Sequence, residues 1–360
     1  MRLPTAKRIS TEKYIAGLSV FKKKLAKIKL SANESAFGPS PKVVKEYNKI
    51  SKSLKFYPDS EGAFLRKKLA KKFKLDSSRI ILGSGSDQIF EFICKAYLNK
   101  NDEVIVSSYS FIVYRIYSKM NGAKVVYAKE NNFFASTKNI LSKVTKKTKI
   151  VFLANPNNPT GTYIDKKNLK DLRKKLRSNI LLVVDDAYFE YVKKKNYSSG
   201  LDLFSKSKNV IVTRTFSKIY GLAGLRVGWG YSSKKIIESL NQVKPPFNVN
   251  MPALHAASVA ILDRNWLKKE IDHINNWRKI MFKKFKEMKI STNEGGANFL
   301  LINFDRIKIN STKAFKELAK FGILVRKMDI YGINNSLRVT IGKSNENKKV
   351  ILKLKKILNV

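Results

Sequence analysis

One lysine in this sequence lies among side chains that suit a bound phosphate. Lys218 follows an apolar, strand-like run, and the hydroxyls of Thr215 and Ser217 come just before it. Arg226 follows among several glycines. In a chain so rich in lysine, any one lysine is by default a solvated surface charge. Hydroxyls and a guanidinium bind phosphate oxygens, however, and a lysine beside a phosphate can form a Schiff base with an aldehyde. The local pattern therefore predicts a phosphorylated aldehyde cofactor.

A second candidate for phosphate binding is the glycine-containing turn at residues 83–88. It follows a short apolar run and precedes a helical pattern, so that Ser86 and Asp87 begin a helix. Backbone N–H groups at a helix N-terminus bind anions. Gln88 occupies the third glycine position of the dinucleotide-binding fingerprint, which is therefore not met. An ordinary capped turn explains the same residues.

Further polar side chains follow apolar runs that are typical of strands buried on both faces. Asn158, Asp185 and Tyr188 lie after two such runs, and Tyr109 lies after a third. In an open α/β sheet the carboxyl ends of the strands form the ligand site. An aspartate there can keep a pyridine nitrogen protonated, although it could also bind a metal or cap a helix. Tyr109 could stack on a planar ring or be a half-buried tyrosine at a strand end.

Two arginines near the C-terminus complete the set of candidate residues. Arg326 ends a short apolar run, and Arg338 alternates with apolar residues in another. Both could be solvated side chains on the outer face of a strand. A guanidinium in this position would also suit bidentate binding of a substrate carboxylate or phosphate, and we predict this role for Arg338 with Arg326 assisting.

The elements that position these residues form an α/β pattern. Strand-like and helical stretches alternate from residue 79 to 231, ending in a strand expected at 225–231. This pattern predicts a mostly parallel sheet covered by helices. A long helical pattern at 253–288 follows, and then mixed strands, including one at 323–326, and helices. We predict an arm at residues 1–40, a large domain at 41–250 and a small α+β domain at 251–360.

Composition narrows the class of protein. The 360 residues carry a formal charge of +46, which first suggests nucleic acid or an anionic membrane. The excess is dispersed lysine without an arginine-rich block, so we expect a field that attracts anionic substrates, with nucleic-acid binding as the alternative from another class. Cys94, the single cysteine, fits a buried helix face and excludes an internal disulfide. His255 and His273 lack zinc-site spacing, so no metal is expected.

No apolar run reaches about 18 residues, the length that a membrane-spanning helix needs. The N-terminus lacks the apolar segment of a secretory signal. A cytoplasmic location is therefore expected by default.

The motifs, taken in order, resemble those of fold-type I, pyridoxal-phosphate-dependent aminotransferases. The motifs that carry this resemblance are NPNNPTG at 155–161, DDAY at 185–188, TFSK at 215–218 and LAGLRVG at 222–228. More narrowly, the chain resembles the histidinol-phosphate aminotransferases through LSANE at 30–34, YPD at 57–59, GSD at 85–87 and LRVTIG at 337–342. Each motif alone is modest, but together they cover nearly the whole chain.

The resemblance implies a seven-stranded, mostly parallel sheet with helices on both faces and pyridoxal 5'-phosphate as the cofactor. Lys218 would hold the cofactor covalently and then move the proton, and Asp185 would pair with the ring nitrogen. Asn158 and Tyr188 would contact the ring hydroxyl, and Tyr109 would stack on the ring. The cofactor phosphate would meet Ser86, Asp87, Thr215, Ser217, Arg226 and, from a neighbouring subunit, Tyr57. The substrate-binding residues would be Tyr14, Asn33, Arg326 and Arg338.

The implied activity is the transamination of L-histidinol phosphate with 2-oxoglutarate in histidine biosynthesis, by a homodimer with shared sites. Two departures from the family pattern lie away from the reacting atoms: Asp186 stands where glutamate is frequent, and Gln88 where an acid is frequent. Residues 35–38 match more loosely, which leaves substrate selection open. An aromatic aminotransferase is the nearest alternative, and a decarboxylase of a phosphorylated amino acid is a third.

Overall fold

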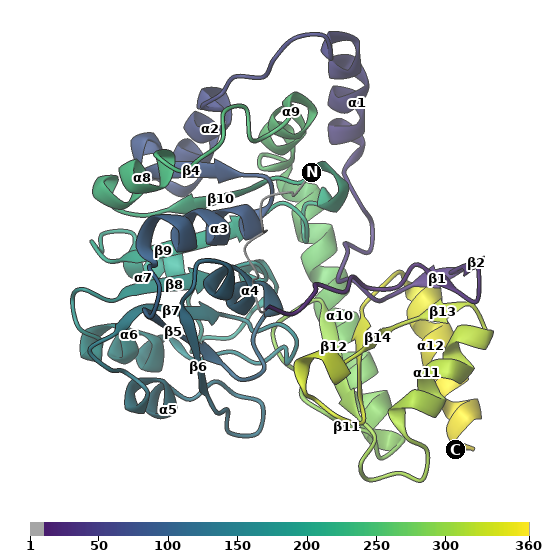
Figure 1. The fold of residues 1–360 in the computed structure, drawn as a ribbon. Coiled ribbons are helices and arrows are strands. Elements are labelled where there is room, and N and C mark those ends of the chain that lie inside the picture. Colours follow the sequence, from purple (N-terminus) through teal and green to yellow (C-terminus); the bar gives the residue numbers. More distant parts are fainter. Residues whose placement is uncertain (1–10, 360) are drawn as a thin grey trace, which may run out of the picture.

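The computed structural model describes residues 11–359 and contains a seven-stranded sheet (Figure 1). Every neighbouring pair of strands is parallel except the two pairs made by β10. The strands, in spatial order, are β4 (Ile80–Gly83), β10 (Gly228–Tyr231), β9 (Val210–Thr215), β8 (Leu181–Asp185), β7 (Thr148–Ala154), β5 (Glu103–Ser107) and β6 (Lys124–Ala128). The predicted mostly parallel sheet is confirmed.

Successive side chains of the sheet enter two hydrophobic cores, one on each face. On β8, Leu182 and Val184 join one core, while Leu181 and Val183 join the other. Because both faces are covered, these strands read as continuous apolar runs. The core with Val183 is closed by α3 (Ser86–Tyr97), α4 (Ile112–Met120) and α8 (Lys234–Asn241). The core with Leu182 is closed by α2 (Ala63–Phe73), α5 (Thr137–Ser142), α6 (Lys166–Lys175), α7 (Gly200–Phe204) and α9 (Met251–Ala260). Cys94 lies in α3 and is buried, as predicted.

The C-terminal part is a smaller α+β unit. Its antiparallel sheet contains, in spatial order, β11 (Ser291–Thr292), β12 (Phe299–Asn303), β15 (Ser336–Thr340) and β14 (Arg326–Lys327). Its helices are α10 (Arg264–Glu287), α11 (Ser311–Lys320) and α12 (Ser344–Leu358). The long helix α10 runs from the large sheet into this part (Figure 1).

The helical pattern expected at 253–288 forms two helices instead of one. Asp263 caps the N-terminus of α10 by accepting a hydrogen bond from the Trp266 N–H. This cap marks the start of a new helix, so α9 and α10 are not continuous. Helix α9 packs against α2 and against α1 (Pro41–Ile50). We therefore propose that the small domain begins near α10 rather than at residue 251.

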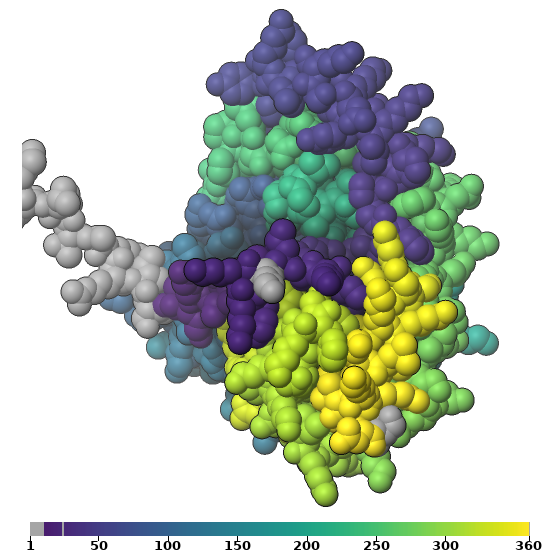
Figure 2. Space-filling view, turned by 90° about the vertical axis from the view of Figure 1, so that its right-hand side faces the viewer, coloured from purple at the N-terminus to yellow at the C-terminus, as the bar shows by residue number. Residues whose placement is uncertain are grey.

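The arm joins the small domain through a strand. β3 (Ile28–Lys29) pairs in parallel with β13 (Ile323–Leu324), and β1 (Val20–Phe21) pairs with β2 (Lys24–Leu25). Figure 2 shows the arm, in dark purple, lying on the lime and yellow C-terminal part. The expected strand at 323–326 is thus divided, because β13 pairs with the arm while β14 pairs with β15. The first ten residues of the predicted arm lie outside the described residues.

Within residues 11–359, none of the helices combines the length and the apolar character needed to cross a bilayer.

Candidate active site

A cavity of about 520 Å³ lies where the carboxyl ends of the central strands meet the arm and the small domain. It brings together all of the predicted site residues except Tyr57 and Tyr109. These lining residues are Tyr14, Asn33, Ser86, Asp87, Asn158, Asp185, Tyr188, Thr215, Ser217, Lys218, Arg226, Arg326 and Arg338. The structure therefore brings these candidate residues together, and we propose this cavity as the active site.

Lys218 is a partly buried lysine in the turn after β9. Its Nζ donates a hydrogen bond to the Ala32 carbonyl at 3.4 Å and lies 5.8 Å from the centre of the Tyr188 ring. Burial, followed by the positive charge of Arg338, lowers the pKa of Lys218 from 10.5 to about 8. A substantial fraction of this amine is unprotonated slightly above neutral pH, so it can act as a nucleophile or base.

Asp185 ends β8 and lines the cavity. Its Oδ2 accepts from the Tyr114 hydroxyl at 2.6 Å, and its Oδ1 accepts from the Thr213 hydroxyl and the Ala187 N–H. Burial raises the pKa of Asp185 to about 6, while these hydrogen bonds oppose the rise. At neutral pH the carboxylate remains ionised and oriented, and a buried anion of this kind suits a cationic partner.

Tyr188 and Asn158 each contact residues from the other side of the cavity. The Asn33 Nδ2 donates to the Tyr188 hydroxyl at 3.0 Å, and Asn33 also accepts from the Thr340 hydroxyl at 3.2 Å. The Arg338 Nη1 donates to the Asn158 Oδ1. Burial raises the pKa of Tyr188 to about 12, so its hydroxyl stays protonated. Asn33 thus lines the cavity, but its side chain is engaged in positioning Tyr188.

The opposite end of the cavity has the character of an anion site. Arg226 pairs with Asp87 at 2.8 Å and donates to the Ser217 hydroxyl at 3.2 Å. Gly85 precedes α3, whose first turn has no side-chain cap. Gly85 has a φ of 83°, which L side chains rarely adopt, and a Cβ there would lie 2.2 Å from the present position of the Arg226 Nη2, so the turn favours glycine. The free N–H groups of the helix, the guanidinium and the hydroxyls, including that of Thr215, converge on the cavity.

The conformation of Arg226 also explains where β10 begins. Residues 223–225 form a short 3-10 turn, and Arg226 has a φ of 55°. This left-handed residue interrupts the extended backbone while its guanidinium reaches Asp87. The strand therefore starts at Gly228 rather than at residue 225 as predicted.

Tyr109 is not among the residues that line the cavity. Its N–H donates to Glu130 at 2.7 Å, and its ring lies 5.7 Å from that of Phe133. Phe111 lines the cavity instead. Because β5 ends at Ser107, the chain needs these further residues to reach the start of α4, where Phe111 is the N-cap. We therefore propose Phe111, rather than Tyr109, as the aromatic residue beside a bound ring.

Sequence reasoning also missed Tyr114. This tyrosine lies one helical turn after Phe111 in α4, and its hydroxyl reaches Asp185 across the core. The sequence did contain a signal for Tyr114: it lies three residues after Phe111, and residues three apart share one face of a helix.

The end of the cavity that holds Arg326 and Arg338 is built from the arm and from β-strands of the small domain. Arg338 donates to the Ser31 carbonyl at 3.1 Å, and its Nε has no hydrogen-bond partner among the described residues. Arg326 donates to the Ile15 carbonyl. Tyr14 lines the cavity with these arginines, and its relative solvent exposure is 49%. Two guanidiniums in a partly closed cavity favour an anionic ligand.

Comparison with known proteins places this geometry in a family. The family model for aminotransferase class I and II matches residues 26–354. The chain belongs to this aminotransferase family. It is 51% identical over 360 residues to a histidinol-phosphate aminotransferase of Pelagibacter ubique (strain HTCC1062), with 100% of both chains covered. It is 40% identical over 324 residues to a histidinol-phosphate aminotransferase of Rhodopseudomonas palustris (strain BisB18), with 90% and 89% covered.

Solved aminotransferases share the fold. A histidinol-phosphate aminotransferase from Sinorhizobium meliloti, in complex with pyridoxal-5'-phosphate, superposes with a TM-score of 0.86 at 23% identity, covering 93% of this chain and 92% of that one. A histidinol-phosphate aminotransferase from Clostridium acetobutylicum gives 0.84 at 24% identity, covering 92% and 98%. The predicted fold-type I architecture is thereby confirmed.

In this aminotransferase, Asp186 lies on the opposite side of β8 from the cavity. It faces Arg214 at 3.5 Å and accepts from the Gly200 N–H at the start of α7. Burial raises the pKa of Asp186 to about 7, against the effect of Arg214. Asp186, which is shorter than the glutamate frequent at this position in the family, therefore anchors a helix and does not line the cavity.

Proposed function

We propose that this aminotransferase uses pyridoxal 5'-phosphate to transfer the amino group of L-histidinol phosphate to 2-oxoglutarate, giving imidazole acetol phosphate and glutamate. The observation that carries the chemistry is Lys218, an amine of lowered pKa that lies between an anion site and the buried carboxylate of Asp185. The substrate is supported by the full-length relative with 51% identity that bears the histidinol-phosphate aminotransferase name.

The lining of the cavity fits the cofactor at each end. The uncapped start of α3 with Arg226 suits a phosphate, and the ionised Asp185 suits a protonated pyridine nitrogen. Asn158 and Tyr188 offer neutral donors for a ring hydroxyl. When bound, pyridoxal phosphate would supply an electron sink for the negative charge that develops at the substrate Cα.

The remaining steps belong to side chains of this chain. Lys218 would attach the cofactor and, once released by the substrate, would take the proton from the substrate Cα at its Nζ. Its lowered pKa of about 8 keeps the amine available as a base near neutral pH. Asp185, held by Tyr114, would keep the ring nitrogen protonated throughout.

Arg338 and Arg326 would bind the anionic end of each substrate. Both now donate to carbonyls of the arm or to Asn158, so an arriving phosphate or carboxylate can take over these donors. A phosphate in one half-reaction and a carboxylate in the other present similar oxygens to a guanidinium. Tyr14 would close the site from the arm.

We further propose a homodimer in which Tyr57 reaches the cofactor phosphate of the second subunit. Tyr57 is 81% exposed and lies away from the cavity of its own chain. Other exposed apolar side chains near it in sequence are Val44, Tyr47, Leu54 and Phe56. Clustered exposure of this kind is typical of an interaction surface.

The decisive experiment compares kcat/KM for L-histidinol phosphate and for phenylalanine, each with 2-oxoglutarate as acceptor. We expect a clear preference for the phosphorylated substrate. The aromatic alternative is favoured by one observation, because Phe111, Val113, Ile116 and Tyr331 give the cavity an apolar side. Preference for phenylalanine would select that alternative, and CO₂ release without an acceptor would indicate a decarboxylase.

A further inference from the structure

Two exposed aromatic rings outside the cavity stack on each other. The rings of Tyr57 and Phe247 lie 4.7 Å apart with an interplanar angle of 24°, although 43% of Phe247 also remains exposed. An exposed tyrosine would otherwise sample several rotamers, because water solvates each of them. The stack therefore restricts the direction in which the Tyr57 hydroxyl points.

Phe247 is presented by a loop of defined shape, residues 244–248, which we call the platform loop. Pro245 and Pro246 restrict its backbone. Phe247 itself has a φ of 53°, a left-handed value that bulky side chains rarely adopt. Such a conformation persists only where surrounding contacts hold it, and it is concentrated at functional sites.

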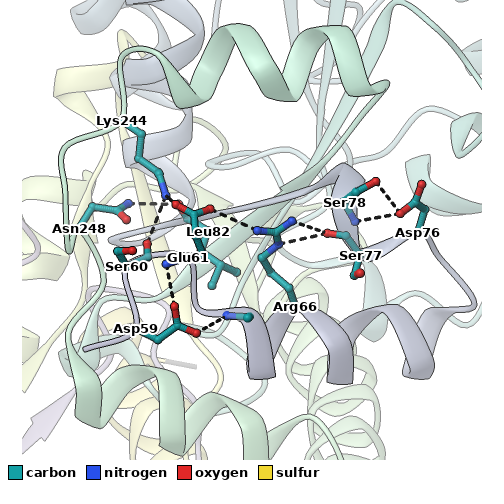
Figure 3. A network of polar contacts seen from close by, with 11 residues as sticks. Asp59, Ser60, Glu61, Arg66, Asp76, Ser77, Ser78, Leu82, Lys244 and Asn248 are labelled. Atoms are coloured by element: carbon teal, nitrogen blue, oxygen red, sulfur yellow. Dashed lines mark hydrogen bonds and ion pairs between the residues drawn. The ribbon is translucent and has the colours of Figure 1, made fainter. Parts of the chain in front are cut away.

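One end of the platform loop is tied to the segment that follows Tyr57. The Lys244 Nζ donates to the Ser60 carbonyl at 3.2 Å and pairs with Glu61 at 3.0 Å. Glu61 also pairs with Arg66 of α2 at 3.3 Å. Figure 3 shows Lys244 reaching down to Ser60 and Glu61, with Arg66 on the far side of the Glu61 carboxylate. The two partners of the aromatic stack thus belong to segments that one ion pair and one hydrogen bond, both made by Lys244, join together.

The other end of the platform loop is tied to the phosphate turn, residues 84–88. The Asn248 Nδ2 donates to the Leu82 carbonyl at 3.1 Å (Figure 3) and to the Gln88 Oε1 at 2.8 Å. The same Gln88 oxygen accepts from the Ser84 N–H at 2.7 Å. One amide oxygen therefore holds both the platform loop and the turn at the N-terminus of α3.

We propose that the platform loop is a positioning device that fixes Tyr57 for the cofactor phosphate of a second copy of the chain, and that Asn248 and Gln88 couple it to the chain's own phosphate turn. This inference rests on the proposed function, because it requires pyridoxal phosphate and a dimer with shared sites. Phe247 acts through Tyr57, so we class it as a positioning residue.

A double-mutant cycle in the full-length dimer tests the first half of the proposal. Tyr57→Phe keeps the stack and removes the hydroxyl, and Phe247→Ala keeps the hydroxyl and removes the stack. We expect each to weaken the binding of pyridoxal phosphate to the cofactor-free protein about tenfold, as for a hydrogen bond to a charged group. The double variant should bind as Tyr57→Phe alone does, because no hydroxyl is left to position. If the fold loss of affinity in the double variant equals the product of the two single losses, the proposal is wrong.

Pyridoxal, which lacks the phosphate, separates positioning from a general structural role. Phe247→Ala should bind pyridoxal as the wild type does, and Phe247→Tyr should restore the binding of pyridoxal phosphate because it restores a ring. Phe321→Ala, which removes an exposed ring on the small domain, is the matched control and should change neither affinity. The proposal is wrong if Phe247→Ala weakens the binding of pyridoxal and of pyridoxal phosphate equally. It is also wrong if the variant dissociates the dimer and both affinities fall equally.

Substitutions at Gln88 test the coupling to the phosphate turn. Gln88→Glu keeps an acceptor oxygen and should stay within about twofold of wild-type affinity for pyridoxal phosphate, whereas Gln88→Leu and Asn248→Ala should each lose about tenfold. Equal affinity in Gln88→Glu and Gln88→Leu contradicts the coupling. A wild-type protein that binds pyridoxal phosphate no better than pyridoxal contradicts the proposed function itself, which distinguishes the two failures.

Discussion

The two sides of the cavity are assembled in different ways. The sheet side, with Asp185 and Lys218, comes from the ends of β8 and β9, which are neighbours in one parallel ladder. The arm side joins segments from opposite ends of the chain, since Ser31 accepts from Arg338 and Asn33 pairs with Thr340. The sheet side is therefore fixed by strand pairing, whereas the arm side depends on how the arm and the small domain dock.

This difference separates two tasks. On the sheet side, Asp185 has its hydrogen bonds from Tyr114, Thr213 and Ala187 already made within the large sheet and its helices. On the arm side, Arg338 donates to a backbone carbonyl and to an amide, contacts that a substrate anion can replace. We expect substitutions on the sheet side to change the state of the cofactor, and substitutions on the arm side to change substrate binding.

The largest effect is expected from Lys218→Ala on the sheet side. Without the amine the cofactor has no covalent attachment and the substrate Cα has no base, so turnover should fall at least about a thousandfold. The visible absorbance of lysine-bound pyridoxal phosphate should be lost as well. Absorbance and single-turnover rates measure both, and Lys235→Ala, on the exposed face of α8, is the control. Retained colour in Lys218→Ala would show that another amine carries the cofactor.

The pH dependence of the cofactor-free protein sharpens this prediction. Folded Lys218 loses its proton near pH 8, while an unfolded lysine keeps it to about 10.5. The unfolded chain therefore binds more protons between these values, and the free energy of unfolding contributed by Lys218 should rise with pH across this window. Chemical denaturation at several pH values, wild type against Lys218→Ala, measures the difference. An identical pH dependence would contradict the lowered pKa.

A smaller loss is expected from Asp185→Asn. The neutral amide cannot stabilise a protonated ring nitrogen, so turnover should fall roughly a hundred- to a thousandfold, the range found when one preorganised electrostatic contact is removed. The cofactor should remain attached through Lys218, and its absorbance should persist in altered form. Stopped-flow half-reactions measure the change, and an effect on KM alone would contradict the division between the two sides.

On the arm side, Arg338→Gln should lower kcat/KM roughly ten- to a hundredfold, as expected for a lost hydrogen bond to a charged group. The loss should appear mainly in KM, for both the amino donor and the oxo acid, while the amount of lysine-bound cofactor stays the same. Steady-state kinetics and spectra test this, with the exposed Arg306→Gln as control. Loss of the bound cofactor would mean that the two sides are not separable.

Tyr114→Phe should have a milder effect on the sheet side. Asp185 would lose one of its donors, and binding of pyridoxal phosphate should weaken by about tenfold or less. Because the Tyr114 hydrogen bond lowers the pKa of Asp185, its removal should raise that pKa above about 6. Cofactor affinity, which falls once Asp185 is protonated, should then begin to fall at a higher pH than in the wild type. Tyr127→Phe, on β6, is the control for loss of a hydroxyl.

The smallest effect on activity is expected from the net charge of the whole chain, most of which lies outside the cavity. The net charge of +46 should draw in anionic substrates, so raising the salt concentration from about 50 to 200 mM should increase KM by a few fold at most. The same series distinguishes the nucleic-acid alternative, because nonspecific binding to DNA should vanish over this range. Binding that persisted and preferred one sequence would support that alternative.

The sheet side could be predicted from sequence because apolar runs fix where strands end. Asp185 directly follows such a run, and parallel pairing brings it beside the end of the strand that leads to Lys218. On the arm side, Arg338 and Arg326 were predicted from their places in apolar runs, whereas Tyr14 and Asn33 were reached only through the family resemblance. Pairing between β3 and β13, which are nearly three hundred residues apart in the chain, leaves no local sequence signal, and this pairing divides the expected strand at 323–326.

Differences of two or three residues from the expected positions had local causes. Tyr109 follows a strand, but the chain continues to the start of α4 before an aromatic ring, that of Phe111, lines the cavity. The left-handed backbone of Arg226 likewise delays β10, a conformation that its flanking glycines do not specify. Caps and single left-handed residues are set by tertiary contacts, here the reach of Arg226 to Asp87.

The burial of Cys94 has a practical consequence. This only cysteine is 0% exposed in α3, and burial raises the pKa of its thiol to about 12. Thiolates rather than thiols react with oxidants and maleimides, so the Cys94 thiol of the folded protein should react with neither. A cysteine introduced at an exposed position of α1 or α12 would be the single reactive thiol, and a fluorophore attached there could report on movement between the two domains during turnover.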